Sequence, residues 1–325
     1  MKQGILNSAD WTLLICQGDS HRDFLQGHLT CDINCLKDGN SLMGAACNLK
    51  GRVVASMFLV NDITASRPGS LLFLPADSVA VLRELWDKYL LLYRGVTLAT
   101  YTGDFRVAAS RVVKRAVEGK KLAATNYSSQ ELLNLGVALQ WGDLGGKGEQ
   151  GETQEKPTST GEEDENNWAA HLIESGVPYV TRTTSGMMTP NMLGYDTLGD
   201  KLKSKAGESL DIVSFADIVS FADIISFTKG CYLGQEVVAR VHYKGKSARS
   251  CHKVSFAATD LPDALGDNPL PIHSRVNDKE NEVGYLVNHY IKDGSCYAIA
   301  LLSVNKVDQS NLYIKDQEVE IGNIL

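Results

Sequence analysis

Long apolar runs are absent from this sequence of 325 residues. No stretch approaches the roughly 18 apolar residues that a membrane-spanning helix needs. The first residues also lack the apolar core and small-residue cleavage site of a secretion signal. We therefore expect a soluble, cytoplasmic protein with no membrane partner.

Paired cysteines are absent as well. The seven cysteines form an odd, scattered set, unlike the dense and even framework of a small secreted domain. No two of them have CxxC spacing, and Cys31 and Cys35 have no matching Cys or His pair downstream. This pattern favours a reducing compartment and predicts no metal site.

An excess of basic charge is also missing, because the formal net charge is -7. Residues 145–167 hold seven acidic residues and two lysines, so the rest of the chain is near neutral. The overall charge does not indicate a groove for duplex nucleic acid, although a local basic patch is compatible with it. Residues 145–167 are almost free of apolar side chains and cannot repay the entropy of ordering, so we expect a disordered surface insertion there.

The chain is long enough for two or more packed units, since single cores usually stop growing beyond about 250 residues. Up to about residue 246, strand and helix patterns occur in mixed order, which predicts α+β layers. Short alternating runs after that point predict a small closed β-barrel, giving domains 1–246 and 247–325. In the first domain we expect helices that begin near Ser20 and Asp77, with these residues as caps. We also expect a hairpin turn in which Gly51 has a positive φ. The expected strands cover residues 11–15, 44–47, 53–60, 71–74 and 96–99.

A hexapeptide is repeated three times over residues 211–228. Because six is even, each copy keeps the same side chains on the same face of a strand. Only one copy can precede Lys229 directly, so the other copies must bulge out or extend an edge. We expect this repeat, like the acidic insertion before Trp168, to loop outward without a function of its own.

Residues 229–240 read KGCYLGQEVVAR and combine a glycine-bounded turn with a helix-compatible run. If the turn enters a helix, Cys231 lies near the positive end of the helix dipole and beside the Lys229 ammonium, and both favour the thiolate. Glu236 and Arg240, four residues apart, are expected to pair on one helix face. The alternative is an inert, buried Cys231 beside glycines that only shape the turn.

The KGCYxGQE form of this segment resembles the YgfZ branch of the folate-binding proteins related to the glycine-cleavage T protein, an aminomethyltransferase. The similarity extends from about Trp11 to Lys246 and is weaker in the C-terminal barrel. The motif residues that carry it are Lys229, Gly230, Cys231, Tyr232, Gly234, Gln235, Glu236 and Arg240, with further matches at residues 24–32, 48–52, 176–179, 189–193 and 238–240.

The resemblance implies an α+β folate-binding domain like that of the T protein, followed by the family's small barrel. It implies a folate-binding accessory protein, using a tetrahydrofolate species, that supports tRNA modification by helping to assemble or repair iron-sulfur clusters in the modifying enzymes. The implied partners are those enzymes or their assembly factors. Cys231 is then a functional thiol, while Trp11 and Trp168 contact the folate, since an indole offers a flat face to an aromatic ring. Without the resemblance, both tryptophans fit core positions.

Two other functions stay open. A folate-dependent aminomethyl or one-carbon transferase needs a carboxylate to manage the amine proton, and Asp32, Asp196 and Glu236 are the candidates. Direct tRNA contact is the other, because a basic run with aromatic residues can bind phosphates, although such a run is often a solvated surface or a connector. That run comprises Arg240, His242, Tyr243, Lys244, Lys246 and Arg249.

Overall fold

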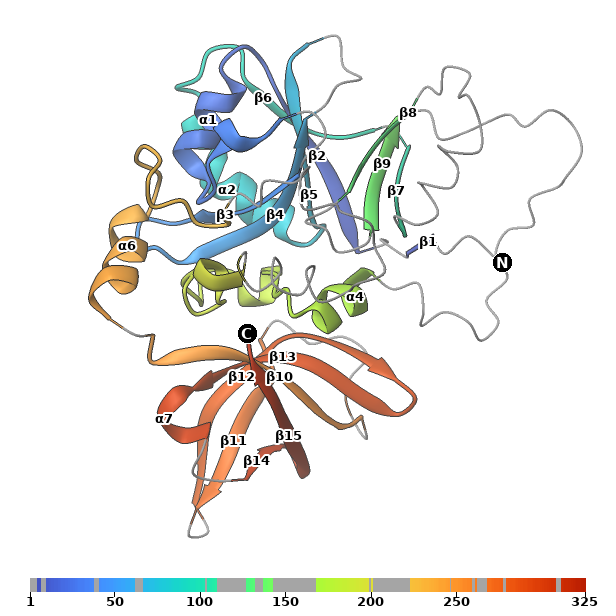
Figure 1. The fold of residues 1–325 in the computed structure, drawn as a ribbon, viewed down its shortest axis with the longest axis vertical. Coiled ribbons are helices and arrows are strands. Elements are labelled where there is room, and N and C mark those ends of the chain that lie inside the picture. The colour runs from blue at the N-terminus through green and yellow to red at the C-terminus, as the bar shows by residue number, and fades with distance from the viewer. Residues whose placement is uncertain are drawn as a thin grey trace, which may run out of the picture.

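The computed structural model contains two sheets, a layer of helices and loops, and a closed barrel (Figure 1). The acidic insertion and the first two copies of the hexapeptide repeat lie outside the residues that it describes. The described residues are 5–6, 10–37, 41–61, 67–102, 104–109, 127–131, 137–142, 168–198, 200, 223–245, 247–258, 261, 268–276, 279–307 and 311–325.

A five-stranded antiparallel sheet forms the centre of the N-terminal part, in the order β3-β4-β5-β2-β6. Side chains alternate between its two faces, so Trp11 and Leu13 enter one core while Leu14 and Cys16 enter the other. The period-2 pattern that predicted this strand is thereby confirmed. The strands are β2 (Trp11–Gln17), β3 (Leu42–Cys47), β4 (Val53–Asn61), β5 (Gly69–Pro75) and β6 (Thr97–Thr100).

Two helices, α1 (His21–His28) and α2 (Ser78–Leu90), cover the second core with Phe24 and Trp86. Both helices begin where the sequence predicts, but neither Ser20 nor Asp77 makes a side-chain cap bond. Asp77 instead accepts hydrogen bonds from the Ser78 hydroxyl and the Arg182 amide. Both residues hold the N-cap position, as predicted, but without the expected side-chain bond; at Asp77 a tertiary contact has taken the carboxylate.

The predicted hairpin joins β3 to β4 through residues 48–52, and Gly51 has the expected positive φ of 66°. The Asn48 side chain accepts hydrogen bonds from the Lys50 and Arg52 amides and closes the turn. A second, four-stranded sheet has the order β1-β7-β9-β8. Its strands are β1 (Ile5–Leu6), β7 (Asp104–Ala109), β8 (Tyr127–Glu131) and β9 (Val137–Gly142).

The C-terminal strands close into a barrel with its own apolar interior, which confirms the predicted fold class. Between the barrel and the first sheet lies a layer that contains α4 (Trp168–Ser175) and the loop after it, and one continuous core joins all three (Figure 1). No helix in the described ranges is long and apolar enough to cross a membrane. The barrel strands are β10 (Arg249–Ala257), β11 (Pro271–Val276), β12 (Lys279–Lys292), β13 (Ser295–Ser303), β14 (Leu312–Ile314) and β15 (Gln317–Ile324), with α7 (Val304–Val307) after β13.

Candidate functional site

The last copy of the repeat leads into the KGCYLGQE segment along the loop that follows α1. Ile224 and Ile225 are buried, and the Thr30 hydroxyl donates to the Ile224 carbonyl at 2.7 Å. The Ser226 amide donates in turn to the Thr30 carbonyl at 2.9 Å. These contacts fix the start of the segment against the loop after α1.

Lys229 is buried and closes the C-terminal end of α1. Its ammonium donates to the carbonyls of Gln26, Leu29 and Cys31 at 2.6, 2.7 and 2.9 Å, which uses all three of its N–H donors. A cation is favourable at this end of a helix, where carbonyls lack partners and the dipole is negative. Burial lowers the pKa of Lys229 to about 8.

Cys231 is exposed, in contrast to the alternative of an inert buried thiol. The Lys229 ammonium is buried among carbonyls, and helix α6 (Gln235–Lys244) begins four residues after Cys231. The effect of a helix dipole falls off within the first turn. Lys229 therefore anchors the segment, and its predicted effect on the Cys231 thiol stays a prediction.

The two glycines of the motif have different roles. Gly234 has a φ of 84°, and a Cβ atom there would lie 2.5 Å from the Asn48 carbonyl oxygen. A Cβ atom on Gly51 in the hairpin would lie 2.8 Å from the Val237 Cβ of α6. A Cβ on Gly230, by contrast, would meet nothing within 4 Å. Gly234 thus permits the close packing of α6 against the β3–β4 hairpin, whereas Gly230 lies in an open part of the turn.

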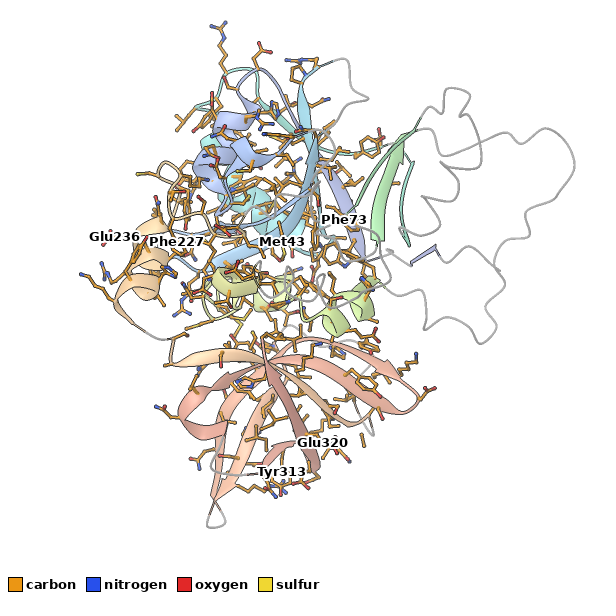
Figure 2. The ribbon with its side chains drawn as sticks, viewed as in Figure 1. Met43, Phe73, Phe227, Glu236, Tyr313 and Glu320 are labelled. Carbon is orange, nitrogen blue, oxygen red and sulfur yellow. The ribbon has the colours of Figure 1, made fainter. Side chains whose placement is uncertain are left out.

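Tyr232 and Gln235 stabilise the turn from within. The Gln235 side chain accepts from the Tyr232 amide at 3.2 Å, and the Lys229 ammonium lies 5.1 Å from the centroid of the Tyr232 ring. Burial raises the pKa of Tyr232, whose hydroxyl has no hydrogen-bond partner. On the outer face of α6, Glu236 and Arg240 form the predicted pair, with Glu236 at the edge of the molecule in Figure 2.

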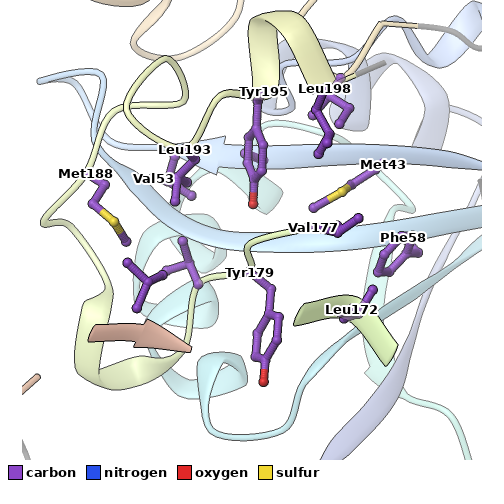
Figure 3. Close-up of a cluster of buried hydrophobic side chains, with 14 of the residues drawn as sticks. Met43, Val53, Phe58, Leu172, Val177, Tyr179, Met188, Leu193, Tyr195 and Leu198 are labelled. Atoms are coloured by element: carbon purple, nitrogen blue, oxygen red, sulfur yellow. The ribbon is translucent and has the colours of Figure 1, made fainter. Parts of the chain in front are cut away.

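Trp11 and Trp168 lie together in the first core, with their rings edge to face at 5.8 Å. Both are buried, and Phe73 and Tyr179 pack on Trp11 at 4.9 and 5.2 Å. Figure 3 shows the adjoining part of this core, with Phe58 and Tyr179. The sequence singled out both indoles, but it did not indicate that aromatic neighbours cover them. The Trp168 Nε1 is a buried donor without an acceptor.

A polar pocket of about 180 Å³ lies beside Tyr179, between the start of α2 and strand β12. It is smaller than the roughly 300–1,000 Å³ of typical small-molecule sites. Neither Cys231 nor an indole lines it, so it does not connect the thiol to Trp11 or Trp168. Sequence reasoning missed this pocket, although the hydroxyl-rich run after Tyr179 was a signal for it. Its lining residues are Asp77, Tyr179, Thr181, Thr183, Thr184, Val287, Asn288 and His289.

The three carboxylates considered for transferase chemistry are occupied elsewhere. Asp32 accepts from the Gln26 side chain, and Asp196 accepts from Asn191. Glu236 pairs with Arg240, and none of the three acids lines the pocket. Over the described ranges, no three His, Cys, Asp or Glu side chains are grouped so that they could hold a metal ion.

Comparison with known proteins confirms the predicted resemblance. No protein-family model matches the chain. It is 26% identical to the tRNA-modifying protein YgfZ of Colwellia psychrerythraea over 311 residues, covering 92% of this chain and 85% of the relative. It is 24% identical to the protein of the same name from Vibrio atlanticus, covering 98% of this chain and 89% of the relative.

The fold has a counterpart among solved structures. The glycine cleavage system aminomethyltransferase T of Bartonella henselae superimposes with a TM-score of 0.59 at 13% identity, covering 98% of this chain and 85% of that one. The chain thus resembles YgfZ proteins in sequence and has the fold of the T protein, as the KGCYLGQE segment predicted.

Proposed function

We propose that this protein is a folate-binding accessory protein that supports tRNA modification. The observation that carries the proposal is the KGCYLGQE segment, where a buried lysine holds a turn with an exposed thiol at Cys231. The similarity to proteins named for tRNA modification covers nearly the whole chain and supports the same conclusion.

The exposed thiol suits contact with a partner protein better than catalysis inside a pocket. Cysteine thiolates are the usual ligands of iron-sulfur clusters, which commonly take four. Cys231 offers a single thiol on a fixed turn, so a partner would have to supply the other ligands. We therefore assign Cys231 a role in assembling or repairing clusters in tRNA-modifying enzymes or their assembly factors, in the reducing cytoplasm where free thiols persist.

Trp11 and Trp168 are the residues proposed to contact a reduced folate. The fit rests on the Trp168 Nε1, a buried donor that lacks an acceptor and that a polar edge of a pterin ring would satisfy. A bound reduced folate supplies a carrier of one-carbon units. Phe73 packs on both indoles, so a folate ring that contacts them would take the place of this side chain in an aromatic surround.

Complementation tests the role of the thiol. A bacterial strain that lacks its YgfZ protein receives the native chain, Cys231→Ala or Cys35→Ala, and methylthiolated tRNA nucleosides are quantified. Cys35 is the matched control because it is the other cysteine that is not fully buried. We expect Cys231→Ala alone to lose the modification. Full modification with Cys231→Ala would remove this thiol from the function.

Tryptophan emission tests the folate site. Titration with tetrahydrofolate should quench the emission of the native chain, and Trp11→Phe and Trp168→Phe should each weaken the affinity. Trp86→Phe is the control, because Trp86 lies in the second core, on the opposite face of the sheet. Equal affinity in all variants would place the folate elsewhere.

The alternative is a folate-dependent aminomethyl or one-carbon transferase, which the fold likeness to aminomethyltransferase T favours. The test is turnover of an aminomethyl donor and tetrahydrofolate by the purified protein, with Asp32→Asn, Asp196→Asn and Glu236→Gln as variants. Turnover that one of these changes abolishes would favour the transferase.

A further inference from the structure

Three segments that are far apart in the sequence form one exposed surface around α6. The Arg52 guanidinium donates to the Met187 carbonyl at 2.6 Å, which joins the hairpin turn to the loop before Tyr195. Asp196, in the helical turn that follows this loop, has a carboxylate oxygen 3.6 Å from Nδ1 of His242 in α6. We call this the α6 surface: the exposed side chains of α6, the hairpin turn at residues 48–52, and Met187.

Aromatic rings lie at the C-terminal end of this surface. His242 stacks on Phe227 with centroids 3.9 Å apart and 18° between the planes, and Tyr243 meets both rings edge to face. Tyr243 is 70% exposed, so most of its ring lies open to solvent on a backing of two other rings. Leu49, at the tip of the hairpin, is 74% exposed. An open tyrosine supported in this way is a stacking platform.

The charge of the α6 surface is opposite to that of the chain, whose net charge is -7. Its acidic neighbours are already engaged, since Glu236 pairs with Arg240 and Asp196 contacts His242. With Arg240 paired to Glu236, the basic side chains left on the surface are Lys50, Arg52 and Lys244.

We propose that the α6 surface binds an unpaired stretch of RNA, with one base stacked on Tyr243 and with phosphates contacting the surrounding basic side chains. Positive charge along a backbone path combined with open aromatic rings is the usual arrangement for single-stranded nucleic acid. The choice of RNA rests on the proposed function. Cys231 lies just before α6, so RNA held on this surface would bring its modifying enzyme to the thiol.

The test is fluorescence anisotropy of a labelled oligouridylate with the full chain, over a series of salt concentrations. Tyr243→Ala should weaken binding about tenfold, whereas Tyr243→Phe, which keeps the ring, should bind as the native chain does. Lys244→Ala should lower the slope of log Kd against log salt by about 0.7, the value for one phosphate contact on a single strand. Tyr243 is exposed, so the fold should tolerate its loss.

Two variants outside the surface serve as controls. Tyr297→Ala removes another partly exposed tyrosine, on barrel strand β13, and Lys88→Ala removes an exposed lysine of α2. Both should bind the oligouridylate as the native chain does. The RNA proposal fails if the native chain shows no binding at low salt, or if Tyr243→Ala binds normally. It fails as well if double-stranded RNA or polyglutamate binds equally well.

The outcome is separable from that of the proposed function. If RNA binding fails while Cys231→Ala still abolishes tRNA modification, only the RNA surface is lost. If Cys231→Ala retains modification, the thiol proposal is lost even where the RNA binds.

Discussion

The two regions that the sequence singled out are built in opposite ways. The indole cluster is held together by ring packing, and the two tryptophans proposed to contact folate are part of that packing. Its members are Trp11, Trp168, Phe58, Phe73 and Tyr179. The KGCYLGQE segment is held by hydrogen bonds and a close glycine contact, while its functional candidate, Cys231, lies outside these contacts. Stability and function are therefore joined in the first region and separated in the second.

The largest effect on stability should come from emptying the indole cluster. Trp168→Ala removes a fully buried ring that packs against four other aromatic rings, and we expect the free energy of unfolding to fall by about 4 kcal/mol. Urea denaturation followed by circular dichroism measures the loss. A decrease below about 1 kcal/mol would mean that the cluster is loosely packed and readily opened, which would erase the contrast between the regions.

Two glycines of one motif provide a matched pair for the second region. Gly234→Ala places a Cβ 2.5 Å from the Asn48 carbonyl oxygen at a left-handed φ, and should cost about 3 kcal/mol of stability. Gly230→Ala meets no atom within 4 Å, and should cost less than about 0.5 kcal/mol. If both variants lost the same free energy of unfolding in urea denaturation, the close contact between Gly234 and the hairpin would be disproved.

The sequence predicted the parts of the fold that depend on local period. The alternation at Trp11, Leu13 and Ile15 gave β2, the residues around Gly51 gave the hairpin, and the four-residue spacing of Glu236 and Arg240 gave their pair. Each of these depends on neighbours in the chain or on one repeating face. The barrel followed in the same way from its short alternating runs.

What the sequence did not predict depends on distant partners. The Lys229 ammonium bonds the Gln26 carbonyl, 203 residues earlier, and no spacing near Lys229 announces an acceptor there. The sequence paired Lys229 with its neighbour Cys231, and only the structure revealed its anchoring contacts with the end of α1. The covering of Trp11 by Phe73 depends on how β2 pairs with β5, and the pocket at Tyr179 depends on how β12 packs on the first domain.

Removing the anchor should have an intermediate effect. Lys229→Met leaves three carbonyls without their donor and should lower the free energy of unfolding by about 2 kcal/mol. It should also reduce tRNA modification, because the turn that presents Cys231 loses its attachment to α1. Lys88→Met, on the exposed face of α2, is the control for the loss of one lysine. A Lys229→Met protein of native stability would contradict the anchoring role.

The pH dependence of stability checks the same lysine with a smaller effect. The pKa of Lys229 is lowered from 10.5 in the unfolded chain to about 8 in the folded protein. Between these values the unfolded chain binds more protons than the folded one, so the contribution of Lys229 to stability increases as pH rises. Buried thiols act in the opposite direction, because burial raises the pKa of Cys31 and Cys47 from 9.0 to about 12. Their contribution to the free energy of unfolding is therefore lost as pH rises through this range, in the native chain and in the variant alike. The stability gap between the native chain and Lys229→Met should therefore widen from pH 8 to 10.5, by at most about 1.4 kcal/mol per pH unit. A constant gap would mean that Lys229 titrates normally.

The smallest change in stability should come from Cys231→Ala, the variant expected to lose the most function. The thiol is exposed, so its removal should alter the free energy of unfolding by less than about 0.5 kcal/mol in urea denaturation. Trp168→Ala cannot separate the two properties in this way, because the same ring packs the core and is proposed to contact folate. If Cys231→Ala instead lowered stability by 2 kcal/mol or more, about as much as Lys229→Met, its loss of tRNA modification would be explained by a damaged turn. The contrast between a buried anchor and a free thiol would then fail, since the thiol would itself be part of what holds the segment together.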